Sequence, residues 1–235
     1  MNRIAVTGTD TGVGKTIASC AIAAALVRRG LRVSAMKPIE TGVDPHDPAR
    51  DGARLHRAAA DDRPLSAVAP ITFPHPSAPV VAARRAGQRV DLELLDARVR
   101  DAARGRDVLI VEGAGGLLVP ITERVSFDGL FARWALDLVI VAANRLGVIN
   151  HARLTIAAAR AANLRVRAVV LNQLAPTPAD TSVSDNARII QEMERVPLVE
   201  LPWMPDVNDL DALAAAAERS GLADLIVPAA AQNPV

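Results

Sequence analysis

The chain contains few residues of several types, and each shortage excludes a class of structure or of function. It contains one cysteine, no tyrosine, three phenylalanines and two tryptophans in 235 residues. A single cysteine excludes a disulfide framework within the chain, and Cys20 lies among Ala and Ile at helical spacing, as expected of a small core residue. So few aromatic rings leave little material for stacking nucleic-acid bases. Aliphatic side chains must therefore form the core.

Long hydrophobic runs and blocks of like charge are also missing. The longest apolar run, residues 17–27, is too short to span a bilayer, and no charged and apolar signal region precedes the first predicted strand. With 27 basic and 26 acidic side chains, the formal charge is +1, so neither nucleic acid nor a membrane is an expected partner. We expect a cytoplasmic protein that acts on small molecules.

Lysine is rare although arginine is abundant. Only Lys15 and Lys37 occur among the 27 basic side chains, and both stand where a predicted strand meets a turn rich in Gly, Pro or Thr. A compact ammonium with three donors suggests chemistry at these sites that the planar arginine fork cannot supply. An arginine-biased composition could also leave two lysines by chance, so their surroundings must decide.

Short β-rich runs alternate with longer segments of helical period. The expected strands are residues 3–7, 33–36, 108–111, 138–142, 166–171 and 197–201. The expected helices are residues 15–29, 51–60, 92–104, 126–134, 151–163, 184–195 and 209–220. The glycines expected to cap three of them are Gly30, Gly105 and Gly221. Apolar strands separated by helices predict a doubly wound, mostly parallel α/β sheet with helices on both faces.

The organisation along the chain predicts a single domain. We expect it to cover residues 1–227 and to be followed by a frayed tail at 228–235. Two proline-bearing connections, 41–50 and 70–79, are long, and such loops are often parts of a site. The first follows Lys37 directly, which favours that interpretation.

A phosphate-binding loop follows the first predicted strand. The segment from Gly8 reads GTDTGVGKT and leads into an apolar helix, which is a P-loop pattern lengthened by one residue. In such a loop, backbone amides and the helix N-terminus surround phosphate oxygens, Lys15 reaches the terminal phosphates and Thr16 ligates Mg2+. A glycine-rich turn that merely joins strand to helix would not need Gly-Lys-Thr in this order. The residues expected to contact ATP here are Gly12, Val13, Gly14, Lys15 and Thr16.

The third long strand ends in an acid and a run of small residues. Glu112 follows the apolar residues 108–111, and a carboxylate at a strand end can hold the Mg2+ that bridges phosphates. The loop expected after it, Gly113-Ala114-Gly115, would let backbone amides approach a substrate or a transferring phosphoryl group. An exposed glutamate before a flexible turn is the alternative. Asp51 opens a predicted helix, where capping and metal binding both remain open.

Four blocks of sequence together carry a family resemblance. GTDTGVGKT, MKPIETG, VEGAGG and LGVINHA, in this order over residues 4–152, resemble the dethiobiotin synthetases, P-loop ligases of biotin synthesis. Weaker similarity continues through VVLNQ and LPW, so most of the chain is covered. The resemblance implies that 7,8-diaminononanoate, CO2 or bicarbonate, and MgATP react through a carbamate and a carbamic-phosphoric anhydride. The products are dethiobiotin, ADP and phosphate.

The resemblance also implies roles for single residues. Lys15, Lys37 and Thr11 would be catalytic, with Lys37 holding the carbamate and the developing charge of the phosphoryl group. The residues that would bind the diamine or its carbamate are Thr11, Lys37, Thr41, Gly115 and Asn150. The Mg2+ ligands would be Thr16, Asp51 and Glu112. Glu112, Gly113, Ala114, Gly115 and Asp51 would also contact ATP.

The nucleotide base is expected at the ends of the last two strands. Asn172 and Gln173 match the adenine-binding segment of the family, and Pro202, Trp203 and Met204 match the segment that closes around base and ribose. From the sequence alone, Trp203 could equally be a core residue. Two departures affect the strictness of ATP preference: Val199 stands where many members have Gly, and Gln173 stands where Asp is common.

The turn at 147–151 implies a homodimer with a shared site. In the family this turn presents helix N-terminal amides and Asn150 to the substrate carboxylate of the neighbouring subunit. His151 suggests a general base, but a capping or interface histidine is the simpler interpretation. Two rivals are weaker: amidoligases carry a further domain, and partitioning ATPases carry an extra lysine where residues 9–11 stand.

Overall fold

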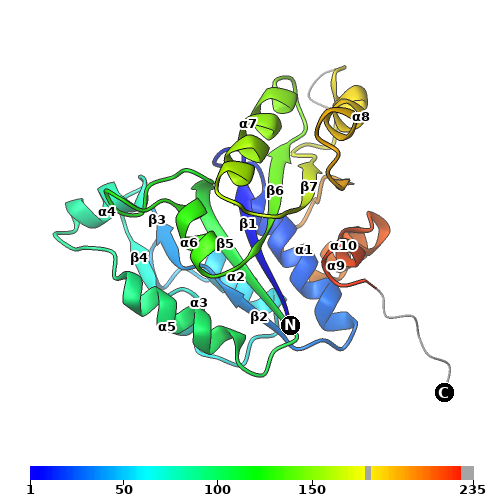
Figure 1. Ribbon diagram of the computed structural model, residues 1–235. Helices are drawn as coiled ribbons and strands as arrows, with labels where there is room; N and C mark the ends of the chain where they lie inside the picture. Colours follow the sequence, from blue (N-terminus) through cyan, green and yellow to red (C-terminus); the bar gives the residue numbers. More distant parts are fainter. Residues whose placement is uncertain (178–180, 229–235) are drawn as a thin grey trace.

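The computed structural model describes residues 1–177 and 181–228 of the chain. Its centre is a six-stranded sheet whose neighbouring strands are all parallel, in the order β2-β5-β1-β6-β7-β8 (Figure 1). The strands of this sheet are β1 (Asn2–Gly8), β2 (Val33–Met36), β5 (Val108–Gly116), β6 (Asp137–Ala143), β7 (Val166–Asn172) and β8 (Leu198–Leu201). A separate two-stranded parallel sheet consists of β3 (Ile39–Thr41) and β4 (Ile71–Phe73).

Helices cover both faces of the main sheet (Figure 1). They are α1 (Lys15–Arg28), α2 (Asp51–Ala58), α3 (Leu65–Val68), α4 (Pro79–Arg85), α5 (Leu92–Ala103), α6 (Phe127–Arg133), α7 (Val148–Ala161), α8 (Val183–Glu194), α9 (Leu210–Arg219) and α10 (Leu222–Ile226). Because side chains alternate along a strand, Ile4 and Val6 of β1 pack with α1, α2, α9 and α10, whereas Ala5 packs with α5, α6 and α7. The doubly wound α/β fold is thereby confirmed.

The central strands are buried on both faces, as their unbroken apolar runs predicted. Residues 108–111 of β5 and 138–141 of β6 are fully buried. All six predicted strands are present, and the three expected capping glycines have left-handed backbone, with φ of +78° at Gly30, +65° at Gly105 and +75° at Gly221. The parallel strands all lead toward the same edge of the sheet, so their ends converge on one region.

Three sequence expectations need correction. The glycine-rich stretch 113–116 is no loop: it continues β5, and Gly116 pairs with Gly8 of β1. Helix α7 begins at Val148 instead of His151, because Gly147 adopts φ +91° and starts the helix earlier. The strands β3 and β4, with the short helices α3, α4 and α10, were not predicted. The two strands have three residues each, too few to show a period of two.

The structure describes the C-terminal end of the chain as far as Pro228. Apart from Pro228, the tail expected to fray at 228–235 lies outside the described residues. The extent of the single domain therefore remains a prediction. Among the described residues, no helix combines the length and the apolar character needed to cross a membrane.

Candidate active site

The conformation of the loop between β1 and α1 depends on two glycines and on a hydrogen bond from the end of β7. Gly12 and Gly14 have φ of +76° and +93°, which glycine adopts without strain. A Cβ atom on Gly14 would also lie 2.0 Å from Asn172 Nδ2, so glycine is required there for space. That amide nitrogen donates to the carbonyl oxygen of Val13 at 3.1 Å. The end of β7 thus holds the loop in place.

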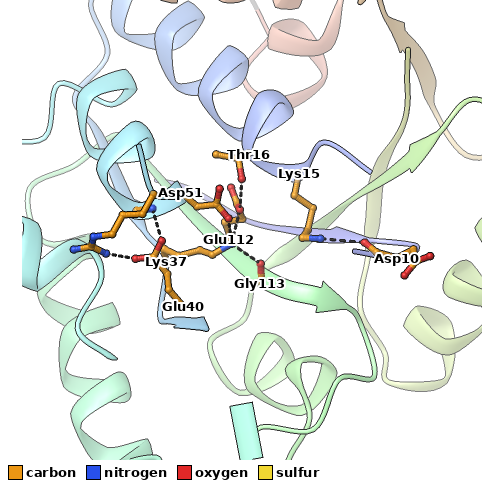
Figure 2. Close-up of polar contacts among 10 residues, drawn as sticks. Asp10, Lys15, Thr16, Lys37, Glu40, Asp51, Glu112 and Gly113 are labelled. Atoms are coloured by element: carbon orange, nitrogen blue, oxygen red, sulfur yellow. Dashed lines mark hydrogen bonds and ion pairs between the residues drawn. The ribbon is translucent and has the colours of Figure 1, made fainter. Parts of the chain in front are cut away.

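Lys15 is the first residue of α1 and folds back over the loop. Its Nζ donates to the carbonyl oxygen of Asp10 at 3.1 Å, as Figure 2 shows. Burial and the neighbouring charge of Lys37 both lower the pKa of Lys15 below its ordinary value. An ammonium that is largely desolvated and that has one carbonyl partner among the described residues is well suited to bind an added anion.

Lys37 lies one residue beyond the end of β2 and is held by three oxygen atoms. Its Nζ donates to Glu112 Oε1 at 2.6 Å, to Asp51 Oδ2 at 3.0 Å and to the carbonyl oxygen of Gly113 at 3.2 Å (Figure 2). The lysine is only 3% exposed. The interpretation of Lys37 as a stray surface residue is therefore wrong, and so is the interpretation of Glu112 as an exposed strand-end acid, since Glu112 is fully buried.

The charges of this group stabilise one another. Burial alone would lower the pKa of Lys37, but Glu112 and Asp51 outweigh it and raise that pKa. Burial alone would raise the pKa of Asp51, but Lys37 and the Thr16 hydroxyl outweigh it and lower that pKa. Asp51 is the first residue of α2 and Arg50 is its N-cap, so the carboxylate of Asp51 faces the site and is not an N-cap.

The donor set of Thr16, Asp51 and Glu112 fits Mg2+. The Thr16 hydroxyl donates to Glu112 Oε1 at 2.9 Å, and Glu112 Oε2 is buried without a hydrogen-bond partner among the described residues. A buried carboxylate oxygen without a hydrogen-bond partner fits a cation ligand, and oxygen donors are those that Mg2+ prefers. Two of these three donors are carboxylates and the third is a hydroxyl. Within residues 1–177 and 181–228, no group of three or more His, Cys, Asp and Glu side chains is arranged to hold a metal.

One cavity joins the two lysines. Its volume is about 690 Å3, and both Lys15 and Lys37 line it. The other predicted site residues in its wall are Thr11, Gly12, Gly14, Thr16, Thr41, Asp51, Ala114 and Gly115. The walls come from the P-loop, the ends of β2 and β5, strand β3 and helix α2, so chain segments more than a hundred residues apart meet here.

The residues expected at the nucleotide base lie outside this cavity. Asn172 is fully buried beneath the loop, and its Oδ1 has no hydrogen-bond partner within the described chain. Gln173 follows it and is partly buried. Trp203 is 39% exposed, so it is not a core residue, while Met204 packs partly against the core. Pro202 is exposed at the end of β8.

The structure of a single chain does not bring Asn150 to the lysines. Asn150 lies in the first turn of α7 and lines another hollow, of about 760 Å3, together with Gly147 and Ile149. His151 is exposed and lines neither of these two cavities, so nothing in their walls supports it as a general base.

Sequence reasoning missed several residues of the cavity wall. Glu40 lines it while forming a buried ion pair with Arg50. Arg54 lines it one turn after Asp51, and its Nε has no partner in the described structure. The proline-bearing stretch 76–79 also contributes. Glu40 belongs to the block MKPIETG, and the stretch 76–79 belongs to a long connection, so both lay in segments that carried a sequence signal, whereas Arg54 did not.

The fold and the site define a P-loop nucleotide-binding protein. Residues 2–210 match a protein family described as "AAA domain". The chain is 42% identical to an ATP-dependent dethiobiotin synthetase BioD of Anaeromyxobacter dehalogenans, over 88% of this chain and 92% of that protein. It is 35% identical to the BioD of Aquifex aeolicus, over 96% and 97%. The chain therefore belongs to the ATP-dependent dethiobiotin synthetases, and it is an enzyme of the ligase class.

A solved structure of lower sequence similarity supports the fold alone. The cell division protein MinD of Aquifex aeolicus superposes with a TM-score of 0.53 at 16% identity, covering 97% of this chain and 94% of MinD. This likeness agrees with the doubly wound P-loop architecture.

Proposed function

We propose that the protein carboxylates and cyclises 7,8-diaminononanoate to dethiobiotin at the expense of ATP. The observation that carries this proposal is that the only two lysines of the chain line one cavity, together with Thr16 and Asp51. The membership of the chain in the dethiobiotin synthetases supports the substrate assignment. A reaction that joins two anions, a carbamate and a triphosphate, needs positive charge, which the two ammonium groups together with Mg2+ would supply.

The nucleotide is assigned to the P-loop. Backbone amides of Gly12 to Thr16 and the N-terminus of α1 surround the phosphates, and Lys15 pairs with their charge. At the other end, the family resemblance assigns Asn172 to the adenine. Its Oδ1 is an acceptor without a partner among the described residues, but it is fully buried, so its neighbours must move before it can accept from the amino group of the base. Gln173 and the segment 202–204 complete the base site in this proposal, and Gln173 weakens the selection of adenine over other bases.

The metal of the reaction is assigned to Thr16, Asp51 and Glu112. Bound there, Mg2+ would neutralise charge on the phosphates of the nucleotide. The chain's own contribution is to keep the three oxygen donors together: Lys37 Nζ lies between the two carboxylates, and the Thr16 hydroxyl is hydrogen-bonded to Glu112.

The proposed reaction has three chemical steps. An amine of the substrate attacks CO2 and loses a proton, giving a carbamate. A carbamate oxygen attacks the γ-phosphorus, and the bond to the β–γ bridging oxygen breaks to release ADP. The second amine attacks the carbamoyl carbon and loses a proton, the carbon–oxygen bond to phosphate breaks to release inorganic phosphate, and the ring closes. Lys37 and Thr11 hold the carbamate against the phosphorus, while Thr41 and Gly115 hold the diamine in the same cavity.

A homodimer would complete the site through Asn150. Two large apolar side chains are exposed near it: Leu146, at 77%, precedes Gly147 in the chain, and Leu154, at 62%, lines the same hollow as Asn150. Exposed apolar side chains of this size mark interaction surfaces when they gather on one face. Amides at the start of α7 would then bind the substrate carboxylate of the neighbouring subunit.

The proposal is tested by the dependence of ATP consumption on the diamine. Purified protein is incubated with MgATP, bicarbonate and 7,8-diaminononanoate, and the product is identified by mass spectrometry. Omission of the diamine should abolish ADP release, and the complete mixture should yield the cyclic urea. ATP hydrolysis that is indifferent to the diamine would refute the proposed reaction.

A further inference from the structure

A second buried charge pair lies beside the Lys37 group. Glu40 and Arg50 are 2% and 6% exposed, and Arg50 Nη1 is paired with Glu40 Oε2. Glu40 Oε1 accepts the backbone N–H of Gly52 at 2.8 Å, and Arg50 Nε donates to the carbonyl oxygen of Pro45 at 3.1 Å. The pair thus connects strand β3 to the connection 42–50 and to the first turn of α2. Figure 2 shows Glu40 next to Lys37.

The first turn of α2 is capped from another element. Its N-cap residue, Arg50, makes no capping hydrogen bond with its own side chain in the part of the chain that the structure describes. The Glu40 carboxylate takes that place, because it accepts the N–H of Gly52 and adds negative charge at the helix N-terminus. Asp51, the residue between Arg50 and Gly52, therefore need not cap the helix itself.

The contact between the Glu40 carboxylate and the backbone of Gly52 leaves no space for a side chain at position 52. A Cβ atom on Gly52 would lie 2.8 Å from Glu40 Oε2, 3.2 Å from Arg50 Nη1 and 2.6 Å from the Cβ of Ala69. Only glycine lets the carboxylate approach the backbone this closely. Buried ion pairs contribute little net stability compared with apolar side chains of similar volume, so stability alone explains this arrangement poorly.

We propose that Glu40 is a positioning residue for Asp51, with Arg50 as its counter-ion. By capping α2 from β3, Glu40 leaves the Asp51 carboxylate free and fixes it toward Lys37 and the oxygen donors of Thr16 and Glu112. This inference rests on the proposed function, because it assigns the freed carboxylate to a divalent cation. Glu40 makes no hydrogen bond to Asp51 among the described residues, so it acts through the backbone N–H of Gly52, the next residue of the helix. Groups outside a metal site that orient its ligands without replacing them have a comparable effect.

The test is metal binding, measured without turnover. Mn2+ is titrated into the protein in the presence of ADP, and free Mn2+ is followed by electron paramagnetic resonance. Glu40→Ala should raise the Mn2+ dissociation constant about tenfold or more, as loss of an outer partner of a metal ligand does. Hydrogen exchange should show loss of protection at the Gly52 amide in the same variant. Unchanged Mn2+ affinity in a folded Glu40→Ala protein would overturn the inference.

A conservative double variant separates capping from charge. Glu40→Gln with Arg50→Met keeps an oxygen acceptor for the Gly52 N–H and leaves no buried charge unpaired. It should bind Mn2+ within about threefold of the wild type, because the outer partner is retained. A tenfold loss in this variant would contradict the capping role, and it decides the matter if Glu40→Ala does not fold.

The matched control is another buried acid paired with arginine. Asp61 accepts from Arg63 and from the backbone N–H of Ala35 at 3.0 Å, away from the cavity. Asp61→Ala should lower stability without changing Mn2+ affinity. If the wild type consumes ATP only with the diamine but Glu40→Ala binds Mn2+ normally, the inference fails and the proposed function stands. If the wild type binds no Mn2+ with ADP, both fail.

Discussion

At the scale of single residues, Lys37 shows why lysine persists in an arginine-rich chain. Its ammonium contacts three acceptors at 2.6 to 3.2 Å, and its side chain is only 4% exposed. A planar guanidinium is larger and directs its donors in a fixed fork, so it cannot contact the same three oxygens from the same position. The local geometry selects an ammonium, whatever the composition elsewhere.

Replacement of this ammonium should therefore slow the reaction. Lys37→Arg keeps the charge but displaces it, and we expect kcat to fall about tenfold or more, equivalent to about 1.4 kcal/mol. Turnover is measured at saturating ATP and diamine, and circular dichroism establishes that the variant is folded. Turnover near that of the wild type would contradict the role assigned to Lys37.

The P-loop offers a second test at single-residue scale. Gly14→Ala forces both a left-handed backbone and a clash with Asn172, whereas Gly30→Ala meets only the backbone strain. Apart from its chain neighbours, no atom of the described residues lies within 4 Å of a Cβ added to Gly30. Gly30→Ala should cost about 1–2 kcal/mol of unfolding free energy. Gly14→Ala should cost more and should weaken ATP binding. Equal shifts in melting temperature for the two variants would show that the Asn172 contact is unimportant.

At the scale of elements, strand ends and their motifs were predictable, but contacts between short elements were not. Lys15 could be placed because it closes the P-loop motif that follows β1, and Glu112 because it follows the apolar residues 108–111 of β5. Parallel strands end at one edge of the sheet, so the two residues were expected to lie close together. Asp51 was ambiguous because the residue that caps its helix, Glu40, lies on a strand of three residues. That strand is too short to show a period, and nothing local in the sequence links Glu40 to Gly52.

The same limit applies to the glycines after Glu112. Their composition suggested a loop, yet they continue β5 because Gly116 pairs with Gly8 of β1. Pairing with a neighbouring strand overrides the low intrinsic strand preference of glycine, and a single sequence does not contain that information. The catalytic assignments, by contrast, came from the family resemblance and remain proposals.

The Asp61 pair gives a prediction for pH at the scale of elements. Burial alone would raise the pKa of Asp61, but hydrogen bonds from Arg63 and from the Ala35 amide outweigh it and lower that pKa. A lowered folded-state pKa means that the ionised group stabilises the protein above the unfolded value, about 3.9, and that this contribution disappears as pH falls. Asp61→Asn should therefore be less stable than the wild type at pH 7. The difference in unfolding free energy should shrink below about pH 4, and a constant difference would contradict the pKa assignment.

At the scale of the whole molecule, Asn150 and the two lysines line different cavities of the chain. The proposed homodimer is the arrangement that would bring Lys37 of one cavity and Asn150 of the other into one site. In a symmetric dimer each site would take Lys37 from one subunit and Asn150 from its partner.

Mixing two defective variants tests this arrangement. Lys37→Ala removes the ammonium, and Asn150→Asp repels the substrate carboxylate, so each homodimer should be impaired. A mixed dimer would contain one intact site, and random reassociation should restore roughly a quarter of wild-type activity. If activity does not recover although subunit exchange has been verified, Lys37 and Asn150 do not form a site shared between two subunits.

The central claim is that the lysine-lined cavity joins a carbamate oxygen to the γ-phosphorus, and isotope transfer tests it most directly. The protein is mixed with MgATP, the diamine and CO2 labelled with oxygen-18, for a time shorter than the exchange of CO2 oxygen with water. Inorganic phosphate is then analysed by mass spectrometry. Transfer through a carbamic-phosphoric anhydride predicts phosphate that carries an oxygen-18 atom, formed in step with dethiobiotin. Unlabelled phosphate accompanying labelled dethiobiotin would contradict the account.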